Sequence, residues 1–362
     1  MRKILGPLLA MIVGGAVLVG IWFSAQEQRG DSANSLTVVR GLIGSEKEGF
    51  YRDPRVVDAF AKLGLRLEVL KSGSREMADH PDLKQFDFGH PAGSPAAQRL
   101  KEVSKAKQLF NPFYTPLAVA SWQKLVPLLQ GNGLVEQRDG VLYLTGLPRL
   151  LKMTADGKRW RELRDNKAYD SGRVVFIAST DVRKSNSAAM YLALASYLLN
   201  GNDVVQSDEA VQKVMPTASQ LFLRQGFLEA SSAGPFEDYV SMGMGKAPLV
   251  MVYESQFIEY QSRLPQPNAE MVLLYPQPTV LTKHVLVPFT EAGARVGEAL
   301  DRDPELQKLA AEYGFRSASP QHFVEFLKQK KLSAPSVLDD VIDPPSYAML
   351  ERMIDVVAAQ MK

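Results

Sequence analysis

The stretch GRVVFIASTDVRKSNSAAMYLALASYLLNG, residues 172–201, decides the predicted fold. Its apolar run 174–178 predicts a buried strand, its polar run 179–187 a loop, and its apolar run 188–199 a helix. A strand, a polar turn and a helix make up half of a βαβ unit. We therefore expect an α/β protein with this unit in its core.

The start of this helix is where the sequence indicates binding chemistry. Ser185, Asn186 and Ser187 are residue types that cap helix N-termini, and Gly201 suits the position after the last turn. A helix N-terminus presents free N–H groups and about half a positive charge. Together with Arg183, this arrangement would suit a small anion. A capped helix without any ligand is the simpler interpretation, and the sequence alone leaves both open.

Length and composition exclude several classes of protein. A chain of 362 residues has room for two domains. Its formal net charge of +2 gives no basic surface for a nucleic acid, so none is expected as a partner. The sequence contains no cysteine, which rules out disulfides, thiolate metal sites, a cysteine nucleophile and a lipoprotein-type anchor.

The N-terminus has the pattern of a membrane anchor. Residues 4–23 carry no charge and follow Arg2 and Lys3. A bilayer span needs roughly 20 such residues, whereas the apolar region of a signal peptide has about 7–15. Phe23 also stands where a cleavage site needs a small residue. We therefore favour an uncleaved inner-membrane anchor over a cleaved signal, with the body of the protein in the periplasm.

The remaining chain alternates strands and helices, which favours a mostly parallel α/β sheet. Strands are expected at residues 36–39, 65–70, 86–88, 117–122, 247–253, 271–276 and 284–289. Helices are expected at residues 53–64, 96–107, 123–130, 147–163, 207–226 with a bend at Pro216, 236–242, 292–300, 305–313, 322–330 and 345–361.

Five segments, in this order, resemble the type II periplasmic solute-binding proteins of ABC importers, on the sulfate, molybdate and phosphate side. They are GLIGSE (41–46), SGSR (72–75), STDVRKSNS (179–187), VYESQ (252–256) and YPQPT (275–279). The sequence is similar in particular to membrane-anchored, substrate-binding-like proteins found beside tellurite and toxic-anion resistance genes. The order and spacing of the segments carry the resemblance, since no single motif is diagnostic.

This resemblance implies a two-lobed periplasmic binding protein type II fold with an N-terminal transmembrane helix. The expected divisions are an anchor at 1–25, a linker at 26–35, lobe I at 36–116 and 270–362, and lobe II at 117–269. In such a fold the ligand lies in the cleft between the lobes. Closure of the lobes excludes water, and each hydrogen bond to the ligand becomes stronger.

The resemblance also implies which residues bind the ligand. Relatives use hydroxyls and backbone N–H groups at helix N-termini, and the matching loops here contain Ser45, Ser72, Ser74, Thr115, Ser185 and Ser187. Arg75 and Arg183 are expected to supply charge, and Glu254 to line the cleft. Charged residues in these loops, Glu46 among them, favour a larger or zwitterionic ligand over a bare oxyanion. A plain turn at 72–74 and a solvated helix-start carboxylate at Glu254 are alternative interpretations.

The sequence gives little support to other chemistry. Its four histidines are His80, His90, His284 and His322, and their spacing matches no common metal site. The sequence has no nucleophile elbow, P-loop lysine motif or dinucleotide fingerprint. We therefore predict no metal, no cofactor and no enzymatic activity.

We predict a periplasm-facing solute-binding protein that captures a small anionic ligand, linked to ABC-type transport through an inner-membrane permease or complex. The alternative is a membrane-anchored envelope scaffold or accessory protein with the same fold and no transported ligand. The anchor and the basic residues between Arg149 and Arg164 motivate this alternative. An enzyme on the same scaffold ranks third, because no nucleophile–base arrangement is visible.

Overall fold

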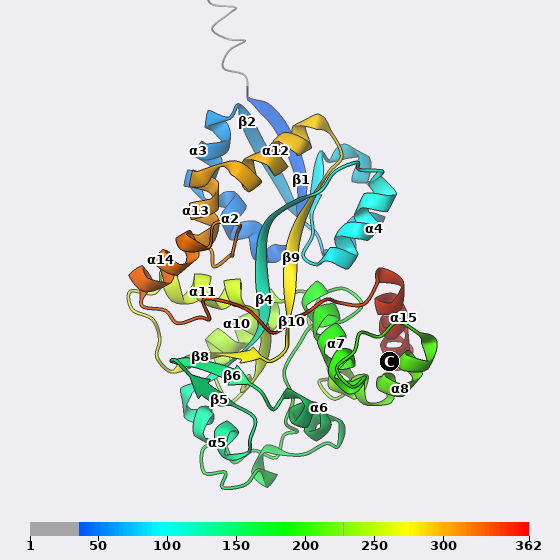
Figure 1. Ribbon diagram of the computed structural model, residues 1–362, viewed down its shortest axis with the longest axis vertical. Coiled ribbons are helices and arrows are strands. Elements are labelled where there is room, and N and C mark those ends of the chain that lie inside the picture. The colour runs from blue at the N-terminus through cyan, green and yellow to red at the C-terminus, as the bar shows by residue number, and fades with distance from the viewer. Residues whose placement is uncertain (1–35, 227, 362) are drawn as a thin grey trace, which may run out of the picture.

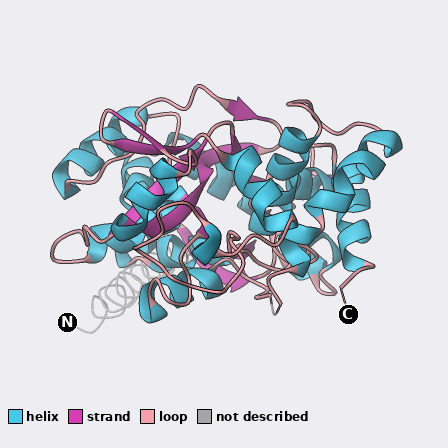
Figure 2. Cartoon of the chain, turned by 90° about the horizontal axis from the view of Figure 1, so that it is seen from below, coloured by secondary structure: helices cyan, strands magenta, loops and turns pink. Residues whose placement is uncertain are grey.

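The computed structural model describes residues 36–226 and 228–361 (Figure 1). The expected anchor at 1–25 and linker at 26–35 lie outside the described residues. None of the helices within the described ranges combines the length and hydrophobicity that a membrane span requires. Helices lie on both flanks of the strands in the view of Figure 2.

Lobe I is built on three parallel strands. β1 (Thr37–Ile43) lies between β2 (Leu65–Lys71) and β3 (Phe88–His90), and β3 pairs with the far end of β9 (Thr279–Pro288) in the antiparallel sense. The helices of this lobe are α2 (Glu48–Arg52), α3 (Pro54–Lys62), α4 (Ser94–Ser104), α12 (Glu291–Arg302) and α13 (Pro304–Glu312). Its main core contains the fully buried side chains of Val39, Ile43, Leu286 and Val296.

Two long antiparallel strands join the lobes. β4 (Phe110–Trp122) has 13 residues, which span about 43 Å at the usual rise per residue. Its first half pairs with β9, with Thr115 opposite Thr282. Its second half pairs with β7 (Val250–Tyr253) and β8 (Met271–Pro276). The sheet is therefore mixed, and the expectation of a mostly parallel sheet is wrong, because β4 and β9 run antiparallel to each other and to β3, β7 and β8.

Lobe II surrounds the second half of β4. β8 runs parallel to β6 (Val141–Leu144), and β6 forms a hairpin with β5 (Glu136–Arg138). The helices are α5 (Val126–Gly131), α6 (Leu147–Ala155), α7 (Asn186–Leu199), α8 (Asp208–Ala218), α9 (Gln220–Leu223), α10 (Ala233–Met242) and α11 (Glu254–Arg263). Residues 186–196 of α7 are all buried, as expected of a helix that is apolar all round.

The C-terminal region contacts both lobes. It contains α14 (Pro320–Lys330), β10 (Val341–Ile342) and α15 (Tyr347–Ala358). β10 pairs with the start of β9, and α15 packs against α7 and α8 of lobe II and against α4 of lobe I (Figure 1). The resemblance implies that residues 270–362 belong to lobe I, but β8 pairs with the lobe II strand β6, and α15 lies mainly against lobe II helices.

The stretch 172–201 folds only partly as expected. The helix is confirmed, and Gly201 after it has a φ of +79°. The predicted strand 174–178 is wrong, because this segment makes only isolated bridges, at Val174 to Arg159 and at Ala178 to Val250. Val175 and Ile177 are fully buried, so the apolar run reflects burial without strand pairing. The predicted helix 147–163 ends at Ala155, and the β5–β6 hairpin was not foreseen.

Candidate functional site

A cavity of about 470 Å³ lies between the two lobes, and we call it the inter-lobe cleft. Lobe I lines it with segments that follow β1 and β2, and lobe II with the start of α7, the start of α10 and the end of β7. Its lining residues are Gly44, Ser45, Glu46, Glu48, Lys71, Ser72, Gly73, Ser74, Glu76, Lys184, Ser185, Asn186, Ala230, Ser231, Ser232, Ala233, Glu237 and Tyr253. The carboxyl ends of strands in open α/β sheets are the usual place for ligands.

A larger cavity of about 770 Å³ lies elsewhere, between β6, β8, α11 and residues 329–333. Many of its polar lining residues, such as Gln123, Gln137 and Gln266, are themselves exposed. The inter-lobe cleft is the better candidate, because buried polar groups of both lobes converge on it.

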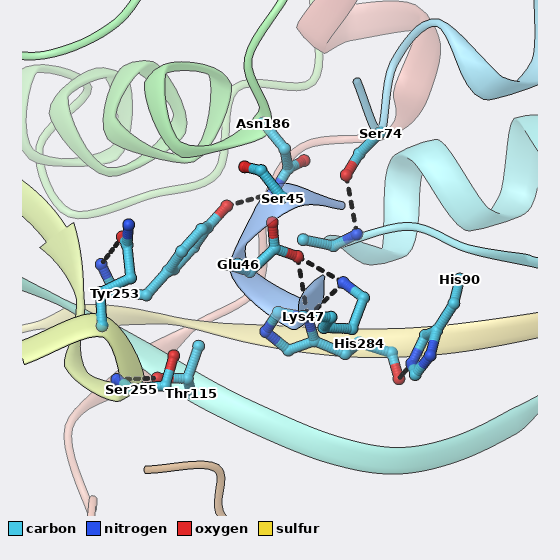
Figure 3. Close-up of polar contacts among 12 residues, drawn as sticks. Ser45, Glu46, Lys47, Ser74, His90, Thr115, Asn186, Tyr253, Ser255 and His284 are labelled. Carbon is cyan, nitrogen blue, oxygen red and sulfur yellow. Dashed lines mark hydrogen bonds and ion pairs between the residues drawn. The ribbon is translucent and has the colours of Figure 1, made fainter. Parts of the chain in front are cut away.

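The floor of the cleft is a buried charge cluster that follows β1 directly (Figure 3). The Lys47 side chain is completely buried, and its ammonium donates a hydrogen bond to Glu46 Oε1. Lys47 Nζ also lies 2.9 Å from His284 Nδ1, and Glu46 Oε1 lies 3.4 Å from the same nitrogen. A buried charge is tolerated only when it is paired in this way.

The ionisation of the cluster follows from burial and proximity. Burial alone would raise the pKa of Glu46, but the Lys47 ammonium and the neighbouring His284 ring hold it well below its usual range. Burial lowers the pKa of Lys47, and the charge of Glu46 opposes this effect. Burial and the charge of Lys47 lower the pKa of His284 to about 4. At neutral pH the cluster is therefore an ion pair beside a neutral imidazole.

A second histidine extends the cluster into lobe I. His90 ends β3, and its Nε2 donates to the His284 carbonyl at 3.2 Å. Its Nδ1 accepts from the Tyr51 hydroxyl at 2.7 Å, and this pairing assigns the neutral tautomer. Within residues 36–226 and 228–361, no three potential metal ligands gather at one place. The histidines thus belong to a hydrogen-bonded chain behind the cleft.

The start of α7 forms the opposite wall. Ser185 is the N-cap residue, yet its hydroxyl pairs with Ser187 Oγ at 2.9 Å, and no side chain caps the helix. The expectation that these hydroxyls cap α7 is therefore wrong. Asn186 donates its side-chain amide to the Tyr253 hydroxyl at 3.1 Å. The first-turn N–H groups of α7 are thus left for solvent or a ligand.

The lobes touch across the cleft. The hydroxyls of Ser45 and Ser231 lie 2.9 Å apart, one from each lobe. Gly93, at the start of α4, has a φ of +93°, and a Cβ there would stand 2.4 Å from Asn186 Oδ1. Only a glycine lets the lobe I loop come this close to α7. The two lobes are therefore in contact with each other in this structure.

The structure brings four of the nine predicted site residues to the cleft: Ser45, Ser72, Ser74 and Ser185. Ser74 Oγ also accepts a hydrogen bond from the backbone N–H of Ala92 at 2.9 Å, so it positions a neighbouring loop as well. Ser187 is buried behind Ser185 and bonds Thr180 Oγ1 at 3.0 Å. It supports the helix start and does not line the cavity.

The structure places the other four predicted residues away from the cleft. Thr115 is buried on β4 and accepts from the N–H of Ser255 at 3.1 Å. Glu254 is completely buried and forms an ion pair with Arg316, with N–O distances of 2.7 and 2.8 Å. The solvated-carboxylate interpretation of Glu254 is therefore wrong.

Both arginines have protein partners. Arg75 makes two hydrogen bonds to Glu351 of α15, at 2.6 and 2.7 Å, and a third to the carbonyl of Arg183. Arg183 pairs with Asp181 two residues earlier. They line an adjoining cavity of about 440 Å³, which shares Ser72 and Glu76 with the cleft.

Sequence reasoning missed three cleft residues, namely Asn186 as a side chain that holds Tyr253 and the serines at 231 and 232, and it missed the buried Lys47 behind the floor. Two serines directly before α10 were a usable signal, because serine is a common helix-start residue. Nothing in the run SEKE marks Lys47 as buried.

Neither a family model nor a curated protein matches the sequence. Solved structures do match in fold. A sulfate-binding protein from Mycobacterium tuberculosis H37Rv has 15% identity and a TM-score of 0.52, with 90% of this chain and 99% of that chain covered. An apo ferric ion-binding protein from Pasteurella haemolytica has 10% identity and a TM-score of 0.54, over 89% and 98%. A periplasmic thiamin-binding protein has 10% identity and a TM-score of 0.54, with 90% of this chain and 97% of that chain covered.

The chain therefore has the two-lobed α/β fold of the type II periplasmic solute-binding proteins, as its sequence predicted. The identities are low, so the likeness establishes the fold alone. The chemistry of the cleft has to be argued from the residues of this chain.

Proposed function

We propose that this protein is a solute receptor that holds a small ligand with an anionic group between its lobes and delivers it to an ABC-type permease. The uncapped start of α7, which faces the serines of lobe I across one cavity, carries this proposal. In the proposed arrangement residues 4–23 anchor the protein in the inner membrane, and the body lies in the periplasm. The protein performs no covalent chemistry.

The cleft has the size and the donors for this role. Its volume of about 470 Å³ lies within the range of small-molecule sites. Seryl hydroxyls and the N–H groups of α7 would bind the anionic group, because an N-terminus combines free donors with partial positive charge. Tyr253 and Ser231 offer further hydroxyls from lobe II. Contact between the lobes would then exclude water from the bound ligand.

A binding panel tests the receptor role. The full chain in detergent would be titrated by calorimetry and thermal shift with sulfate, molybdate, phosphate, phosphate esters and amino acids. A ligand at a hundred times its dissociation constant adds about 2.7 kcal/mol to the free energy of unfolding. Silence across the whole panel would contradict the receptor role and favour the envelope scaffold that the sequence analysis left open.

A pair of variants at Asn186 tests the place of the anion. Asn186 is the first residue of α7, where proline is well tolerated, and Ser185 before it has the extended ψ of 133° that proline requires. Asn186→Pro removes the side-chain amide and the backbone N–H, whereas Asn186→Ala removes the side chain alone. We expect Asn186→Pro to bind at least about tenfold more weakly than Asn186→Ala, because one hydrogen bond to a charged group is lost. Equal affinities would place the anion elsewhere.

A further inference from the structure

The Glu46 carboxylate at the floor of the cleft has one oxygen that is paired within the protein and one that is open to the cleft. Oε1 accepts from Lys47 and lies beside His284. Among the described residues no hydrogen bond reaches Oε2, although the side chain is only 5% exposed and lines the cavity. Figure 3 shows one oxygen turned toward Lys47 and the other turned away from it. Glu46 thus offers an ionised acceptor to whatever enters the cleft.

The charge of the cleft is unlike that expected for a site that binds a bare oxyanion. Its lining contains four carboxylates, Glu46, Glu48, Glu76 and Glu237, against the two lysines Lys71 and Lys184. Glu48 is neutralised by Lys71 at 2.9 Å and by Arg52 at 3.0 Å. Arg52 and the buried Lys47 bring the cations to four, so the charges of the four carboxylates and of these cations cancel. The net charge of these groups does not favour a purely anionic guest.

The wall opposite Glu46, at the start of α7, favours an anionic group. The start of α7 offers N–H donors without a capping side chain, and the Tyr253 hydroxyl accepts from Asn186 and keeps its own proton to donate. Burial and, after it, the charge of Glu46 raise the pKa of Tyr253, so this hydroxyl keeps its proton. One cavity therefore combines an acceptor pole at Glu46 with a donor pole at α7.

We propose, as a refinement of the receptor function above, that the ligand is a small zwitterion whose ammonium group meets Glu46 Oε2 and whose anionic group meets the start of α7. An ammonium has three donors and satisfies the free carboxylate oxygen. A ligand without a donor would cover this oxygen and leave a buried charge incompletely paired, which is strongly unfavourable. Glu46 thereby selects against anions that lack a donor.

Matched pairs of compounds test the inference. The full chain would be titrated calorimetrically with 2-aminoethylphosphonate and ethylphosphonate, 2-aminoethanesulfonate and ethanesulfonate, and β-alanine and propanoate. Each pair keeps the anionic group and differs only in the amino group. We expect at least one amino compound to bind at least about 100-fold more tightly than its partner.

Variants at the floor of the cleft test whether Glu46 causes the tighter binding of the amino compounds. Glu46→Gln keeps the shape and removes the charge, and we expect it to reduce the preference to below about tenfold. Lys47 would then be buried without its counter-charge, so the double variant Glu46→Gln/Lys47→Met provides a neutral floor if the single variant is unstable. Glu68→Gln on the exposed face of β2, outside the cleft, should keep the full preference.

Each outcome has a distinct meaning. If compounds with and without the amino group bind equally, the zwitterion inference is overturned and the receptor function stands. If the preference persists in Glu46→Gln and in the double variant, the assignment to Glu46 is overturned. If no compound binds, and the inorganic oxyanions also fail, the receptor function itself is contradicted, and the inference falls with it.

Discussion

His284 is a buried neutral histidine whose Nδ1 accepts from Lys47 and whose Nε2 has no hydrogen-bond partner among the described residues. Burial and the charge of Lys47 lower its pKa to about 4, compared with about 6.5 in an unfolded chain. Between these two values the unfolded chain binds more protons than the folded chain. The free energy of unfolding should therefore fall as the pH drops from about 6.5 to about 4, by up to about 1.4 kcal/mol per pH unit from this group.

Urea unfolding at pH 7, 6 and 5 measures this slope. His284→Gln should make it shallower, because the titrating group is gone. His90 also has a lowered pKa, caused first by burial, so some slope should remain in this variant. An unchanged slope in His284→Gln would show that other groups govern the acid sensitivity.

Single residues also show where sequence reasoning reached its limit. Four of the six serines that line the cleft were predicted, because each of the four stands in a polar loop after a strand or before a helix. The roles of the charged residues were harder to predict, since their partners are distant in sequence. Arg75 pairs with a residue 276 positions away, and Glu254 with one 62 positions away. No local pattern distinguishes such a structural ion pair from a ligand contact.

The Glu254–Arg316 pair connects two elements, the first residue of α11 and the segment that follows α13. The carboxylate also accepts from the Tyr275 hydroxyl of β8 at 2.8 Å, and Arg316 donates to the carbonyl of Pro335. Arg316→Met should lower the free energy of unfolding by about 3–5 kcal/mol, because it leaves a buried carboxylate unpaired. Equilibrium unfolding in urea would measure the loss.

Two further variants test this explanation. The double variant Glu254→Gln/Arg316→Met should recover much of the lost stability, because no unpaired charge remains. Arg55→Met removes an arginine whose side chain is 52% exposed in its ion pairs with Asp53 and Glu312, and it should cost less than about 1 kcal/mol. A loss at Arg316 no larger than that at Arg55 would contradict a structural role for the buried pair.

At the level of elements, predictions succeeded where the signal was local. The helix α7 was recognised from its polar start and its apolar length, and the tail helices from their periodicity. The prediction of a strand at 174–178 was wrong because a strand needs a neighbouring strand with which to pair. β7 forms only an isolated bridge with this segment, at Ala178. The place of α15 against helices of both lobes was equally invisible, because packing partners leave no mark in a local pattern.

The whole molecule is organised by the contact between its lobes. Bridges that cross it in this structure include the Ser45–Ser231 hydroxyl pair at the cleft, the Arg75–Glu351 ion pair on α15 and the hydrogen bond from Arg75 to the Arg183 carbonyl. A receptor must separate its lobes to admit and release a ligand, so these bridges must break and form again. The chain contains no cysteine, which makes it suited to a test by one introduced disulfide.

Ser45→Cys/Ser231→Cys replaces two hydroxyls that lie 2.9 Å apart, close enough for a bond between the new thiols. When the oxidised protein is free of ligand, it should fail to bind ligand added later, because the lobes cannot part. If the ligand is present before oxidation, it should be retained through dialysis, and reduction should release it. The two single-cysteine variants measure the effect of losing each hydroxyl, and the affinity of each should be the same in either redox state. If the oxidised double variant bound and released ligand as fast as the reduced one, entry to the cleft would not require the lobes to open.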